Sequence, residues 1–140
     1  MDNPRIDIVE DLDGHPVVSA CFDLGEAEIA ASAHALRATA EERFRMPSLS
    51  ADEVLELRDL TALADELGEV SGGRGTVVMS PARLSIYRDA LSHFVETRDE
   101  ADRIREEDRE PLALVRSLLL PLDGLCAEAL RAALSPRPRV

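Results

Sequence analysis

The chain has 140 residues, a net charge of −12 and no lysine, so all 16 of its basic residues are arginines. This acidic balance argues against binding to nucleic acids through phosphate contacts and against binding to anionic membrane surfaces, because both require clustered positive charge. We therefore expect no nucleic-acid or membrane partner. A protein partner, in particular one with a basic surface, or self-association fits the charge better.

Length and composition favour a single helix-rich α+β domain. A chain of this length can bury enough surface to fold without a metal ion or a disulfide. Aromatic residues make up only 3% of the sequence, so the core must consist of Leu, Val, Ile and Ala, and this favours helix packing over a large sheet. We expect one globular domain over residues 1–134 and a disordered tail, rich in Pro and Arg, over residues 135–140.

No targeting or membrane-spanning segment is visible in the sequence. The N-terminal residues include no positively charged region followed by an apolar stretch, and the run Leu118–Leu122 is far shorter than the roughly 20 apolar residues of a membrane span. We therefore expect a cytoplasmic protein. Its two cysteines, Cys21 and Cys126, lie far apart without metal-ligand spacing, and we expect both to be buried, reduced thiols.

Three short segments have the pattern of β-strands. Ile6–Glu10 and Val17–Leu24 are apolar runs separated by the Gly-containing segment Asp11–Pro16, and the second run alternates cleanly between its two faces. This arrangement predicts an antiparallel hairpin. Thr76–Met79 is a short β-branched run and the best candidate for a third strand of a small antiparallel sheet. The sheet is expected to pack against four or five helices.

Helical periodicity begins directly after the hairpin. Ser50 and Glu53 form a capping box that opens a helix expected to run to about Val70, and Ser80-Pro81 has the favoured order of a cap and a first-turn proline. An earlier helix is predicted over residues 26–45. Its apolar face consists of Ile29, Ala33, Leu36, Ala40 and Phe44.

The segment Glu96–Glu110 is dominated by Glu, Asp and Arg. The pairs Asp99/Arg103 and Arg103/Glu107 have the i,i+4 spacing that stabilises a solvated helix. We therefore interpret the segment as a helical extension or connector, with a charged docking surface as the alternative.

The most apolar part of the chain is Leu112–Leu134. We expect Pro111 to open this helical segment and Pro121 to kink or interrupt it, since a proline removes one backbone hydrogen bond. The apolar arc is too wide for one narrow seam, so the segment must supply either the central core helix or a dimer surface. The candidate interaction residues share one face of it and are Leu112, Val115, Leu119, Leu122, Cys126 and Ala129.

One motif suggests chemistry. The sequence Asp-Leu-Asp-Gly at Asp11–Gly14 follows the apolar run Ile6–Val9 and resembles the first motif of the haloacid-dehalogenase-like phosphatases. The resemblance implies a nucleophile at Asp11, an acid/base at Asp13 and a bridging Mg²⁺. Thr76–Ser80 resembles the second motif of that family. No later strand ends in the acidic pair that completes the metal site of the family, so we interpret Asp11–Gly14 as the hairpin turn.

No other pattern assembles a catalytic or metal site. His15, His34 and His93 share no ligand spacing, and no motif supplies a nucleophile, a base and an oxyanion hole. We therefore predict no catalytic residue, cofactor or metal, and favour a non-enzymatic protein–protein interaction or oligomerisation module, such as a homodimer. The alternatives are a small Mg²⁺-dependent enzyme or ligand-binding protein that uses Asp11 and Asp13, and an acidic inhibitor or antitoxin that binds a basic partner.

Overall fold

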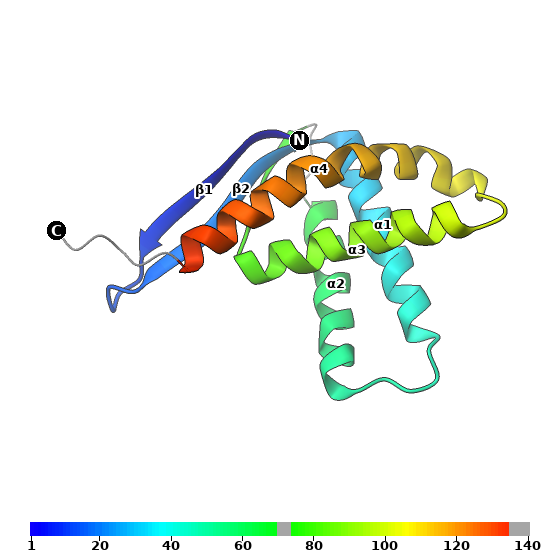
Figure 1. The fold of residues 1–140 in the computed structure, drawn as a ribbon, viewed down its shortest axis with the longest axis horizontal. Helices are drawn as coiled ribbons and strands as arrows, with labels where there is room; N and C mark the ends of the chain where they lie inside the picture. Colours follow the sequence, from blue (N-terminus) through cyan, green and yellow to red (C-terminus); the bar gives the residue numbers. More distant parts are fainter. Residues whose placement is uncertain (70–73, 135–140) are drawn as a thin grey trace.

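The computed structural model describes residues 1–69 and 74–134. It contains a three-stranded antiparallel sheet and four helices (Figure 1), which confirms the predicted α+β class and the third strand. The expected helix end at Val70 and the expected tail over residues 135–140 lie outside the described residues. The elements are β1 (Asp2–Glu10), β2 (Pro16–Gly25), α1 (Glu26–Phe44), α2 (Ala51–Glu69), β3 (Arg74–Met79), α3 (Pro81–Glu100) and α4 (Glu106–Leu134).

The strand order is β1-β2-β3, so the described sheet has β1 and β3 as its edges. Strands β1 and β2 pair in unbroken antiparallel register from Arg5↔Cys21 to Glu10↔Pro16, and a bulge precedes Arg5. The hairpin closes where the Asp11 amide donates to the His15 carbonyl at 2.9 Å. Because alternate residues of a strand point to opposite faces, β2 presents one apolar face and one mixed face.

Helices α1, α3 and α4 contact the sheet, and the apolar face of β2 is the buried one. Figure 1 shows α1 and α2 as a pair that projects away from the sheet, while α4 runs along the hairpin. The register between β2 and β3 brings Val77 and Met79 onto the same buried face. The residues of β2 on this face are Val18, Ala20, Phe22 and Leu24.

Helix α1 is the central helix of the fold, since it packs against α2, α3 and α4. Its many alanines allow this close approach from several sides. Ser32, which is buried on α1, forms a 2.6 Å hydrogen bond with the hydroxyl of Tyr87 on α3. Burial raises the pKa of Tyr87 although this hydrogen bond lowers it. Phe44 was expected to face inward but is 56% exposed, because α1 ends there.

The predicted starts of α2 and α3 are confirmed. The Glu53 amide donates to Ser50 Oγ at 3.2 Å and the Ser50 amide donates to Glu53 Oε1 at 3.3 Å, which completes the capping box of α2. Ser80 Oγ accepts a hydrogen bond from the Arg83 amide at 3.2 Å at the start of α3. These side chains satisfy amides that a helix start leaves without intrahelical partners.

The prediction that Asp99/Arg103 and Arg103/Glu107 pair within one helix was wrong. Helix α3 ends at Glu100 because Ala101 adopts an extended backbone conformation, so Arg103 does not share a helix with Asp99 or Glu107. Asp99 instead forms an ion pair with Arg116 of α4. Residues 101–105 therefore form a connector between two antiparallel helices, while the flanking parts of the predicted segment, 96–100 and 106–110, belong to α3 and α4.

The prediction that Pro111 opens the last helix was also wrong. Helix α4 begins at Glu106 and continues through both Pro111 and Pro121. Each proline removes the donor for a carbonyl four residues earlier, at Glu107 and Ser117, and both of these residues are exposed, so water can take the place of the missing donor. Among the described residues, no helix is both long and apolar enough to cross a membrane.

Candidate functional site

The predicted interaction residues on α4 lie mainly in the core of the chain itself. Four of them are buried, and Leu119 and Cys126 are half-buried at the edge of the core. Of the two roles predicted for this apolar arc, the structure therefore shows the central core role. The large apolar side chains that α4 leaves exposed are Leu120, Leu130 and Leu134. The four buried residues are Leu112, Val115, Leu122 and Ala129.

The Asp11–Gly14 segment forms the tip of the hairpin. Asp11 Oδ1 accepts hydrogen bonds from the amides of Asp13 and His15 at 2.9 and 2.8 Å, and Gly14 has a positive φ of 79°. The Asp11 carboxylate therefore stabilises the turn, as aspartates commonly do. Asp13 and His15 are exposed, and the turn brings no further acidic strand end beside them.

The cysteines and histidines lie in different parts of the molecule. Cys21 is buried on the mixed face of the sheet, where its thiol donates to Asp7 Oδ2 at 3.2 Å, and burial together with this carboxylate raises its pKa. Cys126 is half-buried, and burial raises its pKa as well. The described residues contain no group of three or more His, Cys, Asp or Glu side chains arranged to hold a metal ion.

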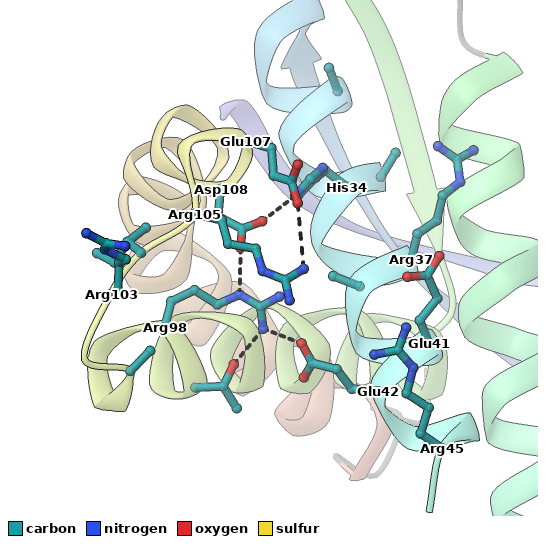
Figure 2. A pocket seen from close by; sticks show the side chains of 16 residues that line it. His34, Arg37, Glu41, Glu42, Arg45, Arg98, Arg103, Arg105, Glu107 and Asp108 are labelled. Carbon is teal, nitrogen blue, oxygen red and sulfur yellow. Dashed lines mark hydrogen bonds and ion pairs between the residues drawn. The ribbon is translucent and has the colours of Figure 1, made fainter.

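A pocket of about 770 Å³ lies between α1, the end of α3 and the start of α4 (Figure 2). This volume is within the range of small-molecule binding sites. The residues that line it come from α1 (Ala30, Ala33, His34, Arg37, Ala38, Glu41 and Glu42), from the segment after α1 (Arg45) and from the region of the α3–α4 turn (Thr97, Arg98, Ala101, Arg103, Ile104, Arg105, Glu107 and Asp108).

A chain of charged side chains forms one wall of this pocket. His34 Nε2 lies 2.7 Å from Asp108 Oδ1, and the other oxygen of Asp108 accepts a 3.3 Å hydrogen bond from Arg98 Nε. Arg98 Nη1 donates to Glu42 Oε1 at 2.5 Å. His93 Nε2 lies 3.6 Å from the second oxygen of Glu42. The network joins α1, α3 and α4, so it fixes the relative positions of the three helices around the pocket.

Asp108 is the buried centre of the network, with only 4% of its surface exposed. Burial acts to raise the pKa of Asp108, but the hydrogen bond with His34 and the charge and hydrogen bond of Arg98 outweigh it, so this pKa is lowered. The Arg98 guanidinium also lies 4.4 Å from the centroid of the Phe94 ring. Asp108 is therefore held as a carboxylate at neutral pH.

The other arginines of the pocket differ in how they are paired. Arg105 forms an ion pair with Glu107 at 3.7 Å, and Arg37 forms one with Asp65 at 3.5 Å. Among the described residues, Arg45 and Arg103 form no hydrogen bond or ion pair with a carboxylate. Figure 2 shows the Arg105 guanidinium on the side of His34, whereas Arg103 extends away at the edge. The lining contains five arginines and four carboxylates in a chain of net charge −12, and one of these arginines, Arg37, pairs with Asp65 outside the lining.

The residues that line the pocket include one hydroxyl group and one imidazole. The hydroxyl group, on Thr97, donates to the backbone carbonyls of His93 and Phe94, so it is not oriented as a nucleophile. The imidazole, on His34, is bonded through Nε2 to Asp108. Sequence patterns could not reveal this site, because His34 and Asp108 are 74 positions apart and the connector has no recognisable motif.

No protein-family model matches this chain, and neither does any curated protein or solved structure. Its function must therefore be inferred from the chemistry of its own residues.

Proposed function

We propose that the protein binds a small molecule with an anionic group and an apolar portion in the pocket between α1, α3 and α4. The observation that carries this proposal is the state of Arg45 and Arg103. The chain has 28 acidic residues for 16 arginines, so carboxylate partners are abundant, yet these two arginines at one pocket pair with none within the described part of the chain. A third arginine, Arg105, pairs only with Glu107, at 3.7 Å.

The charge of the pocket supports an anionic ligand. Glu42 and Asp108 share the guanidinium of Arg98. Because Arg105 pairs with Glu107 and Arg37 with Asp65, Arg45 and Arg103 are the lining arginines left for an anion. A guanidinium group presents several N–H donors in one plane, which suits the two oxygens of a carboxylate or the oxygens of a phosphate. An oxyanion of either kind is therefore the group that these arginines bind best.

The apolar part of the ligand is expected to lie on the small side chains of the pocket. Ala30, Ala33 and Ala38 of α1 and Ala101 and Ile104 of the α3–α4 turn supply this surface. Alanines leave space that larger side chains would fill, and most ligand sites combine such apolar area with a few polar groups. We therefore expect a small aromatic or aliphatic body attached to the oxyanion.

Titration calorimetry with phenyl phosphate, benzoate and inorganic phosphate tests this function. Phenyl phosphate is expected to bind more tightly than inorganic phosphate, since only the former has an apolar part. Arg45→Gln and Arg105→Gln should each weaken its binding about three- to tenfold, the loss of a charge-assisted hydrogen bond at a partly exposed site.

Arg58→Gln is the matched control. Arg58 is an exposed arginine of α2 outside the pocket, so its removal changes the net charge equally without touching the site. If Arg58→Gln and Arg105→Gln weakened the binding of phenyl phosphate equally, only the overall charge of the protein would matter for binding. No heat of binding for phenyl phosphate or benzoate at millimolar concentration would contradict the proposed function.

A further inference from the structure

Strand β1 lies at an edge of the sheet, and the side chains on both of its faces are exposed to solvent. Of its nine residues only Ile6 is half-buried, and the others are exposed. Ile8 is 51% exposed on the helix side, and Val9 is 57% exposed on the opposite side. A long edge strand with exposed apolar side chains is a template for pairing with another strand. The pairing of β1 with β2 identifies which of its backbone groups point outward, away from β2.

The register of the hairpin shows which residues of β1 direct their backbone groups outward. Asp11 and His15 form a hydrogen-bonded pair, and antiparallel pairs alternate between hydrogen-bonded and non-hydrogen-bonded types. Arg5, Asp7 and Val9 therefore bond to β2. The backbone groups of Pro4, Ile6 and Ile8 then point away from the sheet, except that Pro4 has no N–H to offer.

We propose that β1 pairs antiparallel with β1 of a second copy of this chain, with the two-fold axis at Ile6, so that two sheets become one of six strands. In this register Arg5 lies opposite Asp7 of the other copy, and Asp7 lies opposite its Arg5. These are non-hydrogen-bonded pairs, in which facing side chains approach most closely. Two cross-strand ion pairs thus form on the mixed face of the sheet.

The helix-side face is complementary in the same register. Ile6 meets Ile6 of the other copy, and Ile8 meets Pro4, so the apolar face of each sheet continues into the other. Asp2 is separated from this regular stretch by the bulge between Asp2 and Arg5, which takes it out of register with Glu10 of the other copy. The self-complementary segment is therefore residues 4–8.

Neighbouring registers with the same backbone pattern are less favourable. With the axis at Asp7, the two Asp7 carboxylates face each other, and like charges in facing positions are destabilising. With the axis at Ile8, Asp7 faces Val9 and Ile6 faces Glu10, so Asp7 has no ion-pair partner. Arg5 then faces Asp11, which lies beyond the strand in the hairpin turn, where its carboxylate accepts hydrogen bonds from the amides of Asp13 and His15. Charge complementarity therefore selects the axis at Ile6. Because five residue pairs form a small interface, we expect a weak dimer with a Kd above about 1 µM.

Sedimentation equilibrium of single and mixed variants tests this pairing. Arg5→Asp places two aspartates opposite each other, and Asp7→Arg does the same with two arginines, so each variant alone should dimerise at least about tenfold more weakly than the natural chain. An equimolar mixture of the two variants restores both ion pairs and should dimerise within about threefold of the natural chain.

Arg58→Asp, which makes the same charge change on α2, should leave the dimer unchanged, and circular dichroism checks that every variant is folded. The proposal is overturned by a natural chain that keeps its monomer mass of 15.3 kDa up to millimolar concentration. It is also overturned by an Arg5→Asp variant that dimerises like the natural chain, or by a mixture that stays monomeric while the natural chain dimerises.

Discussion

Replacing Asp108 by asparagine removes the charge at the centre of the network that joins α1, α3 and α4. Asp108 accepts hydrogen bonds from His34 and Arg98 and is almost fully buried. A hydrogen bond to a charged group contributes about 1.5–3 kcal/mol, and breaking a fully buried ion pair costs about 3–5 kcal/mol.

For Asp108, we expect a loss of stability below the roughly 3–5 kcal/mol of a fully buried ion pair. Arg98 keeps its bond to Glu42, and 34% of the His34 side chain is exposed, so water and Glu42 compensate both groups in part. We therefore expect Asp108→Asn to lower the free energy of unfolding by about 2–3 kcal/mol at pH 7. For a chain of this size, such a loss lowers Tm by about 6–10 °C.

The effect should depend on pH with a defined sign. Because the pKa of Asp108 is lowered from about 3.8, its carboxylate stabilises the fold above that value, and the stabilisation is lost as pH falls through the folded-state pKa. The difference between the natural chain and Asp108→Asn should therefore shrink as pH falls below about 4.

Urea unfolding at several pH values measures this difference, and urea is preferred over guanidinium chloride because it does not screen charges. Asp59→Asn, at an exposed position on α2, is the matched control and should change stability by less than about 0.5 kcal/mol. A loss in Asp108→Asn no larger than in this control, or a loss that stays the same from pH 7 to pH 3, would refute the role of the network.

Three further predictions concern the core, a helix cap and a thiol. Leu122→Ala should cost about 2–5 kcal/mol because Leu122 is fully buried, whereas Leu120→Ala should be nearly neutral because Leu120 is 81% exposed; equal effects in urea unfolding would be inconsistent with the packing of α4. Ser50→Ala removes the cap of α2 and should cost about 0.5–2 kcal/mol, and an unchanged Tm would argue against the capping box. Cys21 should react with iodoacetamide more slowly than Cys126, because Cys21 is more deeply buried and Asp7 also raises its pKa; faster labelling of Cys21 in peptide mapping would oppose this.

Local signals in the sequence were sufficient for most of the fold. Alternation in β2, the capping box at Ser50 and the Ser80-Pro81 start are determined by neighbouring residues, and each is found where it was predicted. The connector was misjudged because no glycine or proline marks the end of α3 near Ala101. The start of α4 was misjudged because a proline at residue 111 is tolerated when the carbonyl that loses its donor is exposed.

The candidate site could not be predicted in the same way. Its wall depends on tertiary contacts, such as the one between His34 and Asp108, that no spacing rule encodes. His34 shares no ligand spacing with the other histidines, so no pattern in the sequence indicated its bond to Asp108. What the sequence could not show is that Arg45 and Arg103 would lie at a pocket without a carboxylate partner among the described residues. The excess of acidic residues made such arginines improbable on composition alone.

The central claim, that the pocket binds an anion, is tested most directly by NMR of arginine side chains. Adding phenyl phosphate should shift the Nε–Hε signals of Arg45 and Arg105 and the ring signals of His34 along saturable curves with one common Kd, while the signal of Arg58 stays in place. Signals that do not move, or shifts of equal size in Arg58 and the pocket arginines, would contradict the claim.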